Sequence, residues 1–531
     1  MEYHYNLVDE AWVPCTDLQG DFKLRSLRET LLLAHELREI HAELPPMTAS
    51  ILVLLLAILY RSLHPADEDE WVTCWERGAF DPQTINRYLE QWRDRFDLFD
   101  ETHPFYQDPL IGKRQKDIEK LKGNSIEPKD INGLILHSSS GDTATLFDHS
   151  TDAQSLAFSP AQMARHLLMF QSFSLGGMTS ASISADKFYT DSPHARGVAL
   201  FLRGKNLFQT LMLNLIASNN LSDPLSGKGA DRPAWEMDDP LKDERQIPLG
   251  LTDFLTWQSR RLLLIPSNQS ELLKVKQLYS APGLVLSTEF ENPFFSTYSV
   301  EISKGKFEKK LLRFSGEKAL WRDSQTILGD FRSKRTPPAA LTWINSLLYY
   351  GLLDSRINIL AYGICSSPGK KKAFFYREES FSYPIEFLKN HNLLDKLTRH
   401  LYMAGQVKSL LWGSLSKLAA LILSTESDFG EGKKANPEDI KTLINHWGAE
   451  AFFWKELEIP FYHLVNAMPK DPQKAEAGWI EAQRKTAISA FNQAEIMSGL
   501  NIRVLKASSK ARGQLLGSLK KELVSEEKEE K

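Results

Sequence analysis

The chain has 531 residues, of which 42% are hydrophobic, 25% charged and 10% aromatic. This composition argues against extensive disorder, and the length favours two or three domains over a single core. With 64 basic and 68 acidic residues the formal net charge is −4, so the chain has no overall positive field, and any contact with nucleic acid must come from local basic patches.

The chain contains three cysteines, Cys15, Cys74 and Cys365, and no two of them form a Cys-x-x-Cys pair. An odd number of widely spaced cysteines is typical of a reducing compartment. We therefore expect a cytoplasmic protein without a cysteine-rich zinc site. The N-terminus has neither a basic head nor an apolar stretch, which predicts that there is no signal peptide.

The N-terminal part of the chain predicts a strand followed by helices. Residues 3–15 are strand-like, whereas residues 22–44 carry leucine and isoleucine near helical spacing. The longest apolar run, Ile51 to Tyr60, is too short to cross a bilayer, which takes about 20 residues. We interpret it as a buried core helix that starts after residues 45–50. Residues 84–99 continue the helical pattern.

Residues 112–150 are rich in glycine, serine, asparagine and aspartate, which predicts loops. The segment holds four residues of types that bind metals, namely His137, Asp142, Asp148 and His149. Because no fixed spacing relates them, a polar loop that becomes ordered on a partner is a better interpretation than a metal site.

A helix with clear start and stop signals follows these loops. Ser159 suits an N-cap and Pro160 the first helical position, and Gly176 with Gly177 predicts the helix end. A functional interpretation of the two glycines also exists, because a surface without side chains lets another backbone approach closely. From the residues alone, the C-cap is the better interpretation.

The middle of the chain mixes helix and strand. Residues 206–217 predict a helix, and residues 254–265 predict either a strand or a helix. Residues 297–314 predict a β-hairpin with Lys304 and Gly305 at its turn. The hairpin is rich in lysine, with Lys304, Lys306, Lys309 and Lys310. Such lysines usually protect a sheet edge from aggregation, and insertion into a DNA groove is the alternative.

Two further strand-like arms, residues 355–365 and 372–384, bracket a turn with concentrated positive charge. The turn consists of Ser366, Ser367, Pro368, Gly369, Lys370, Lys371 and Lys372. A lone run of lysines is usually solvated surface. A rigid turn that holds this charge at its tip is better suited to contact with a phosphate backbone.

Beyond Pro384 the sequence predicts only helices, over residues 385–424, 437–468, 472–498 and 500–525. Four helices with short connections are typical of an antiparallel bundle. We therefore expect an α+β fold. A large, irregular, mixed α/β N-terminal domain spans residues 1–380, and a C-terminal four-helix bundle spans residues 385–531.

The last predicted helix carries a basic stripe. Arg503, Lys506 and Lys510 are spaced i, i+3 and i+7, which places them on one helical face. In an acidic chain such a stripe indicates binding to a polyanion, and a solvated bundle face is the alternative.

The sequence contains no P-loop, no nucleophile elbow and no Gly-x-Gly-x-x-Gly motif. His35 and His41 resemble a zinc-protease motif, but they are six positions apart and so point to different faces of a helix. The sequence therefore predicts a protein without catalytic activity, cofactor or metal.

An ordered set of motifs resembles one known family. The motifs are NLVDEAWVP at 6–14, SLRETLLLAHELREI at 26–40, LFDETHPFYQDP at 98–109, GDTATLFDH at 141–149, SPAQMARHLLMFQSFSLGG at 159–177, DRPAWE at 231–236 and GLTDFLTWQSRRLLL at 250–264. Taken together they resemble the large subunit of the type I-E CRISPR surveillance complex Cascade, the CasA family, over nearly the whole chain.

The resemblance implies a DNA-reading subunit and not an enzyme. Members of this family lie beside the 5′ handle of the CRISPR RNA, among the other Cascade subunits. They probe double-stranded DNA for a short protospacer-adjacent motif (PAM), mainly from the minor groove. They part the strands to start an R-loop, and they help recruit a helicase-nuclease. We expect the same partners here, and no membrane.

The family's DNA-reading elements can be carried over to this chain. The glycine loop becomes Ser174–Met178, centred on Gly176 and Gly177, and the hairpin lysine becomes Lys304 or its neighbour Lys306. The strand wedge falls on residues 366–372, where some members have Asn and Gln and this chain has Ser-Ser-Pro-Gly. That departure favours a probe driven by shape and charge.

Two further regions follow from the resemblance. The loop that docks near the RNA handle contains Asp142, Thr143, Thr145, Phe147 and His149. The basic face of the last helix, formed by Arg503, Lys506 and Lys510, then holds DNA near the bundle. Some relatives carry a cysteine cluster in the middle region. This chain has none there, so we expect no zinc.

Overall fold

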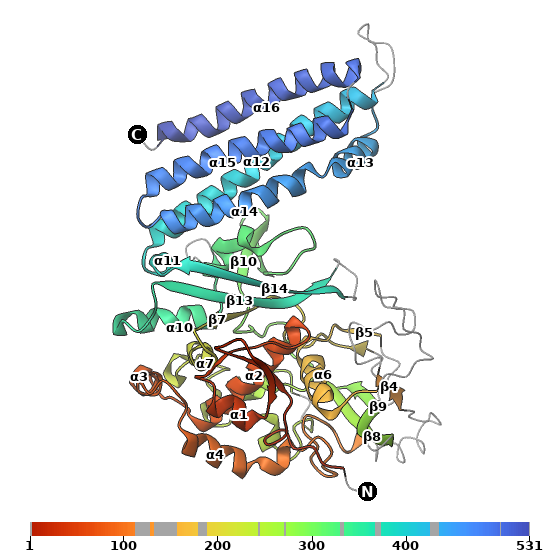
Figure 1. Ribbon diagram of the computed structural model, residues 1–531, viewed down its shortest axis with the longest axis vertical. Coiled ribbons are helices and arrows are strands. Elements are labelled where there is room, and N and C mark those ends of the chain that lie inside the picture. Colours follow the sequence, from red (N-terminus) through yellow and green to blue (C-terminus); the bar gives the residue numbers. More distant parts are fainter. Residues whose placement is uncertain are drawn as a thin grey trace. The chain divides into compact units, whose positions relative to one another are not determined.

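The computed structural model describes residues 3–111, 128–131, 157–178, 188–242, 245–269, 272–329, 334–366, 373–424, 435–499 and 501–529. The chain forms two compact units. The first comprises Met1–Leu320, Phe331–Leu353 and Ile357–Ser382, and the second comprises Trp321–Asp330, Asp354–Arg356 and Tyr383–Lys531. The first unit mixes helices with small sheets and the second is helical (Figure 1), which confirms the predicted α+β class.

The helices of the first unit are short, apart from one in its core. They are α1 (Leu27–Leu32), α2 (Pro45–Ser62), α3 (Glu68–Glu76), α4 (Pro82–Gln91), α6 (Pro160–Phe173), α7 (Leu207–Asn214), α8 (Leu251–Leu255) and α10 (Ala339–Leu347). The strands are β1 (Val13–Asp17), β2 (Phe22–Arg25), β3 (Leu37–Ile40), β4 (Lys129–Asp130), β5 (Gly177–Met178), β6 (Phe188–Tyr189), β7 (Ala199–Arg203), β8 (Arg260–Gln269), β9 (Leu272–Pro282), β10 (Thr297–Ser303), β11 (Lys306–Leu311), β12 (Arg335–Thr336), β13 (Arg356–Ser366) and β14 (Ala373–Pro384).

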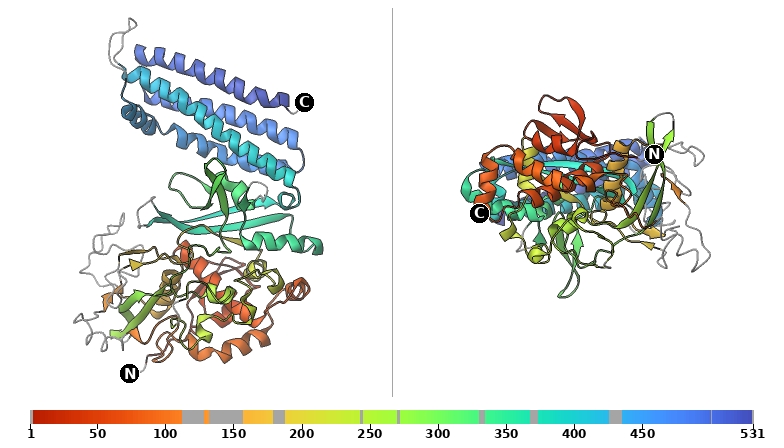
Figure 2. Two further views of the ribbon diagram at one scale, coloured as in Figure 1. Left: turned by 180° about the vertical axis from the view of Figure 1, so that it is seen from behind. Right: turned by 90° about the horizontal axis from the view of Figure 1, so that it is seen from below.

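These strands form several small sheets in place of one large one. Within the described ranges the strand orders are β2-β1-β3, β11-β10-β12, β14-β13-β7 and β4-β9-β8, and β5 with β6 forms a two-stranded ribbon. Figures 1 and 2 show the β8–β9 and β13–β14 pairs well apart from each other. The predicted hairpin over residues 297–314 and the two predicted arms are confirmed as β10–β11 and β13–β14.

The helix α2 fills the core of the first unit. Residues Met47 to Tyr60 are all buried. The helix begins at Pro45, so the prediction that it starts after residues 45–50 is wrong: Pro45 and Pro46 occupy the first turn, where a missing N–H costs nothing. By length and composition α2 could cross a membrane, but 83% of its apolar window is buried inside the protein, as in a core helix.

The helix predicted over residues 22–44 is wrong for most of its length. Only α1 is helical there, and it is flanked by β2 and β3. In β3 the buried residues are Leu37 and Ile40, and Ile40 lies opposite Cys15 of β1 in an antiparallel pair. The leucines near helical spacing therefore belong to two different elements, α1 and β3. Pairing of β3 with β1 overrides the local helical preference.

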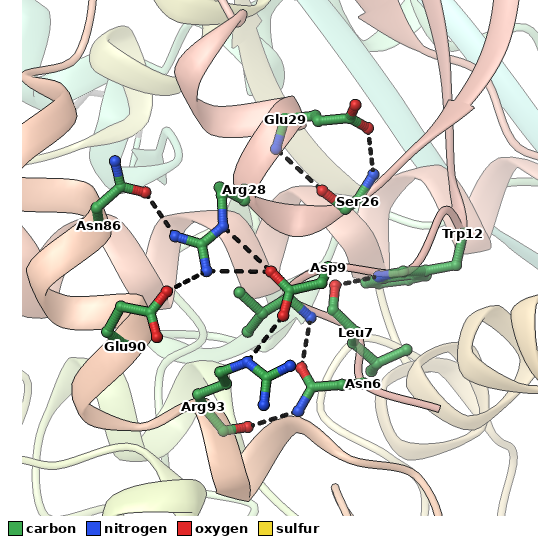
Figure 3. A network of polar contacts seen from close by, with 11 residues as sticks. Asn6, Leu7, Asp9, Trp12, Ser26, Arg28, Glu29, Asn86, Glu90 and Arg93 are labelled. Carbon is green, nitrogen blue, oxygen red and sulfur yellow. Dashed lines mark hydrogen bonds and ion pairs between the residues drawn. The ribbon is translucent and has the colours of Figure 1, made fainter. Parts of the chain in front are cut away.

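The N-terminal motifs hold the fold together (Figure 3). The Asp9 carboxylate accepts bonds from Arg28 Nη2 at 3.1 Å and from Arg93 Nε at 2.8 Å. Asn6 donates to the Arg93 carbonyl at 2.9 Å, and Trp12 Nε1 donates to the Leu7 carbonyl at 3.0 Å. The conspicuous polar residues of this motif thus fasten the first segment to α1 and to the 3₁₀ helix, Arg93–Phe96, that follows α4.

The second unit is a helical bundle. Its helices are α9 (Ser324–Leu328), α11 (Glu386–Lys389), α12 (His391–Leu423), α13 (Pro437–Trp447), α14 (Ala449–Ala467), α15 (Pro472–Met497) and α16 (Ile502–Glu529). Four of these are long, as predicted. The predicted helix over residues 437–468 is two helices, because Gly448 has φ +61° and ends α13 in the left-handed conformation. Trp321 joins this core by packing on Phe461 with ring centroids 4.7 Å apart.

Candidate nucleic-acid interface

The two glycines after α6 are not its C-cap, so that interpretation of the sequence is wrong. The start of α6 is as predicted, with Ser159 and Gln162 forming a reciprocal capping box. The chain leaves the helix at Ser174 in an extended conformation. Gly176 and Gly177 both have φ outside the left-handed range that a glycine C-cap adopts.

A second stretch of chain runs back beside the glycine segment. β5 pairs antiparallel with β6. Next to this ribbon, the backbone N–H of Ser192 donates to the Ser174 carbonyl at 2.8 Å, and that of His194 donates to the Ser172 carbonyl at 2.8 Å. The segment that contains the glycines is therefore tied to the returning chain on both sides of Ser174.

His194 anchors the returning chain in the core. Its side chain is buried, with ring centroids 5.5 Å from Phe173 and 5.4 Å from Phe294. Burial lowers the pKa of His194 to about 3, so the ring is neutral at pH 7. A neutral imidazole packed among aromatic rings fixes the backbone that supports the glycines.

The two glycines differ in what surrounds them. A Cβ on Gly176 would lie 2.7 Å from the carbonyl oxygen of Tyr189, so this position has no room for a side chain. A Cβ on Gly177 would have no heavy atom within 4 Å. Gly176 is therefore required by the fold, whereas nothing in the described part of the protein requires Gly177 to be glycine.

A buried arginine holds the backbone of the glycine segment in place. Arg260 is 1% exposed and donates to the carbonyls of Ser259 at 2.8 Å, Thr190 at 2.7 Å and Leu175 at 3.4 Å. Its guanidinium also lies 4.6 Å from the ring centroid of Tyr189. Burial lowers the pKa of Arg260 to about 10, which leaves it charged at neutral pH. Arg260 thus joins the chain just before the glycines to the chain just after β6.

Asp191 joins the glycine segment to a second arginine. Its Oδ1 accepts the backbone N–H of Gly176 at 2.5 Å, and its Oδ2 accepts Arg196 Nε at 2.8 Å. Neither Asp191, Arg196 nor Arg260 was singled out from the sequence. The one available signal was an arginine pair inside the apolar run of residues 250–264, since arginine is almost never fully buried without partners.

The β10–β11 hairpin presents lysines at its tip. Gly305 takes φ +77° at the turn, and its N–H donates to the Glu301 carboxylate at 2.8 Å. Lys304 and Lys306 are exposed, and among the described residues no carboxylate pairs with either of them. Their neighbours are paired: Lys309 with Glu291 at 2.5 Å, and Lys310 with Glu308 at 3.6 Å. Lys304 and Lys306 are therefore the uncompensated charges of the hairpin.

The chain that returns beside the glycine segment leads on to residues that contact the hairpin and the β13 arm. The backbone N–H of Val198 donates to the carbonyl of Leu312, at the base of the hairpin, at 3.0 Å. Tyr362 of β13 lies opposite Ala199 of β7. Beyond that pair, a Cβ on Gly363 would lie 3.1 Å from the Gly197 carbonyl. Residues 197–199, which follow the chain that returns beside the glycine segment, thus contact both the hairpin base and the β13 arm.

Several predicted site residues lie outside the described residues. These are the handle-docking residues Asp142, Thr143, Thr145, Phe147 and His149, and the wedge residues Ser367, Pro368, Gly369, Lys370, Lys371 and Lys372. Ser366 is the last residue of β13.

The basic stripe on α16 is exposed. Arg503, Lys506 and Lys510 all lie on the outer surface of this helix, and Arg503 Nε donates to the Leu421 carbonyl of α12 at 3.2 Å. Arg512 differs from them, because it pairs with Glu495. The stripe is a separate candidate surface on the second unit.

The residue types that suggested metals are not grouped in the part of the chain that the structure describes, where no three His, Cys, Asp or Glu side chains come together. His35 and His41 flank the strand β3 and do not lie on a helix. The expectation that His35 and His41 lie on a helix is therefore wrong, since the residues between them pair with β1.

The motif at residues 231–236 is structural. The Asp231 carboxylate accepts the backbone N–H groups of Thr252 at 2.8 Å and Asp253 at 2.9 Å, which satisfies the start of α8. Glu236 pairs with Arg61 at 2.7 Å and accepts the Tyr88 hydroxyl at 2.7 Å. These contacts stabilise the fold, so the motif does not by itself indicate a binding site.

Comparison with known proteins gives one consistent picture. The family model described as CRISPR-associated protein Cse1 matches residues 6–490. The curated CRISPR-associated protein CasA/Cse1 of Thermus thermophilus is 28% identical over 542 aligned residues, covering 98% of both chains. The crystal structure of CasA from Thermus thermophilus superposes with a TM-score of 0.79 and 25% identity over 97% of this chain and 99% of that one. A chain of a CRISPR RNA-guided surveillance complex has the same fold, with a TM-score of 0.74, 18% identity and coverage of 97% and 99%.

Proposed function

Because this chain belongs to the CRISPR-associated Cse1 family, we propose that it reads the PAM in double-stranded DNA as the large subunit of an RNA-guided surveillance complex. The observation that carries this proposal is the contrast between Gly176, which the fold requires, and Gly177, which no contact among the described residues requires. A glycine that no neighbouring atom requires, next to a backbone that is held in place, is suited to close approach by a partner.

The partner that fits Gly177 is the minor groove of DNA. The groove is about 6 Å wide, so bare backbone enters it more easily than a side chain does. Its donor and acceptor pattern is degenerate, which suits recognition of a short and relaxed motif. Gly176 cannot offer its own N–H, because Asp191 already accepts it. The segment therefore acts through shape and through the open face of Gly177.

The hairpin supplies the charge for this contact. Lys304 and Lys306 lack carboxylate partners among the described residues, so each can neutralise a phosphate and release counterions. Their backbone is fixed by the turn at Gly305. The chain that returns beside the glycine segment bonds the base of the hairpin through Val198 and Leu312, which supports the proposal that both elements act on one duplex.

The strand wedge and the RNA contact complete the proposal. Residues 366–372 follow directly on β13 and would press between the strands to start the R-loop, a step that costs a few kcal/mol of unstacking per base step. Cationic contacts and the RNA–DNA hybrid offset that cost. The loop with Asp142, Thr143, Thr145, Phe147 and His149 would dock near the 5′ handle of the CRISPR RNA.

The rest of the function belongs to the same proposal. Residues 1–380 read the PAM and dock near the RNA handle, while the bundle of residues 385–531 holds DNA along Arg503, Lys506 and Lys510. The chain acts without catalysis and without a cofactor, in the cytoplasm. It helps recruit the helicase-nuclease once the R-loop has formed.

The proposal is tested by reconstituting the complex with its guide RNA and binding it to a duplex library with a randomised PAM. With this chain present, bound duplexes should be enriched for a short motif beside the target. Without it, enrichment should disappear. Equal enrichment in both cases would assign PAM reading to another subunit.

A scaffold that only joins other subunits is the second candidate. It is separated from the first by a triple variant, Lys370→Ala with Lys371→Ala and Lys372→Ala. The proposed function predicts weaker DNA binding and a smaller salt dependence for this variant, whereas a scaffold predicts no change in either.

A further inference from the structure

Three charged residues, Asp191, Arg196 and Arg260, cluster beside the glycine segment. Asp191 uses one carboxylate oxygen for the Gly176 N–H and the other for Arg196 Nε, at 2.5 and 2.8 Å. Arg260 bonds the carbonyls of Leu175 and Thr190, the residues that directly precede Gly176 and Asp191. Two cations and one anion therefore share a few residues of backbone.

The charges in this cluster do not cancel. Among the described residues Arg260 pairs with no carboxylate and bonds only carbonyls. Burial lowers its pKa to about 10, and Tyr189 and Asp191 act in the opposite direction, so Asp191 lies within electrostatic reach of Arg260. With two guanidinium groups and one carboxylate, the cluster has a net charge of +1.

Arg196 is the member of the cluster that carries this charge to solvent. Its side chain is 39% exposed, compared with 28% for Asp191, while Arg260 is 1% exposed. The bond to Asp191 uses Nε, so in the described part of the chain both terminal nitrogens of Arg196 are without a bonded partner. A guanidinium held at one edge and open at the other is suited to bind a phosphate through two parallel hydrogen bonds.

The backbone that carries Arg196 is held on both sides. Before it, His194 donates to the Ser172 carbonyl and the Ala195 N–H donates to Ser192 at 3.1 Å. After it, Gly197 leaves no room for a side chain against Phe295, and Val198 bonds the base of the hairpin. Little conformational entropy remains to be lost when an anion binds here.

We propose that Arg196 binds a phosphodiester of the nucleic-acid backbone, with Asp191 as the residue that positions it beside Gly177. The proposal rests on the proposed function, because the phosphate belongs to the duplex whose minor groove meets Gly177. It adds an anion site at the root of the glycine segment. It also explains why Asp191 lies at a surface that binds a polyanion: this carboxylate orients the guanidinium of Arg196, and Arg260 keeps the cluster at a net positive charge.

A residue that binds phosphate and a residue that reads bases should affect DNA affinity differently. A phosphate contact adds affinity for every sequence alike, and its removal lowers the salt dependence of binding. We would measure the Kd of the reconstituted complex for a duplex with the PAM and for one without it, each at several salt concentrations. The variants are Arg196→Gln and Arg196→Lys.

The matched control is Arg203→Gln. Arg203 has a similarly exposed side chain, at 35%, and also pairs with one carboxylate, that of Glu39 at 2.7 Å. It lies at the far end of β7 from the glycine segment. Thermal melting of each variant shows whether the substitution has affected folding.

The expected result for Arg196→Gln is a slope of log K against log salt that is smaller by about 0.9, with the same loss of affinity for both duplexes. Arg196→Lys should restore part of the slope, and Arg203→Gln should leave it unchanged. An unchanged slope for Arg196→Gln would overturn the assignment. So would an altered PAM preference with an unchanged slope, since Arg196 would then act only by positioning Gly176.

The failure of this proposal can be told apart from failure of the proposed function. If Gly177→Ala abolishes PAM preference while Arg196→Gln changes nothing, the proposed function stands and the phosphate site is wrong. If Gly177→Ala leaves PAM preference intact, the proposed function fails, whatever Arg196 does.

Discussion

The backbone N–H of Val198 donates to the carbonyl of Leu312 at 3.0 Å, and this bond joins the chain that follows the glycine segment to the base of the lysine hairpin. The tip of the hairpin lies roughly 20 Å beyond this bond, at about 3.3 Å per residue. The chain that supports the glycine segment and the base of the hairpin, which are far apart in the sequence, are therefore joined directly.

The first prediction concerns the stability of the glycine segment. Gly176→Ala should lower the free energy of unfolding by about 1–3 kcal/mol, because the new Cβ meets the backbone oxygen of Tyr189. Gly177→Ala should change it by less than about 0.5 kcal/mol, since no atom lies near the new Cβ. Chemical denaturation measures both. Equal effects would remove the distinction on which the proposed function rests.

The second prediction separates free from paired lysines on one hairpin. Lys304→Ala and Lys306→Ala should each lower the salt slope of DNA binding by about 0.9 when the lysine contacts a phosphate. Lys309→Ala should have a smaller effect, because Glu291 already holds that ammonium group. Filter binding at several salt concentrations gives the slopes. A larger effect at Lys309 would show that the contact surface lies on the shaft and not at the tip.

How far the sequence predicts this site depends on how local each feature is. The hairpin, its turn and the two arms follow from alternation and turn residues, and all were predicted. Arg196 and Asp191 could not be predicted, because their roles arise from contacts with Gly176 across a chain reversal.

The same reasoning explains the errors in the fold. The helix end at Gly176 was predicted from local chemistry, but the chain leaves α6 at Ser174 to pair with Ser192. The strand β3 has helical spacing in sequence, yet it pairs with β1. In both cases a tertiary hydrogen-bond partner outweighs a weak local preference. The break at Gly448 was a local signal that the sequence interpretation overlooked.

The third prediction concerns acid stability. Burial holds the pKa of His194 at about 3, below its ordinary value of 6.5. The unfolded chain therefore binds a proton between these values while the folded chain does not, so stability falls as pH decreases from about 6.5. Between pH 7 and pH 5 the decrease should be about 2 kcal/mol from this residue.

His194→Phe provides the comparison for this effect. The variant keeps an aromatic ring among Phe173 and Phe294 but has no titrating group. Its stability should fall less steeply over the same pH range, even if its stability at pH 7 is lower because the hydrogen bond with Asn292 is absent. Parallel pH profiles for the two proteins would mean that His194 is not the group that titrates.

The fourth prediction tests the basic face of the bundle. Lys506→Ala with Lys510→Ala should lower the salt slope of DNA binding by the reconstituted complex, by up to about 0.9 for each phosphate that the variant no longer neutralises. Lys441→Ala with Lys455→Ala is the control, because these lysines are exposed on α13 and α14, which are other helices of the bundle. Equal effects of the two double variants would mean that the stripe contributes only general surface charge and is not a specific DNA-binding face.

The central claim is that the open face of Gly177 meets the minor groove of the PAM. It is tested most directly by the Kd for a duplex without the PAM divided by the Kd for a duplex with it, measured on complexes that carry Gly177 or Gly177→Ala. Gly413→Ala is the control, since that glycine also has open space around it but lies on α12. The account predicts that Gly177→Ala lowers the ratio about tenfold or more, since reading one base pair is worth about 1–3 kcal/mol, and that Gly413→Ala does not. An unchanged ratio for Gly177→Ala would contradict it.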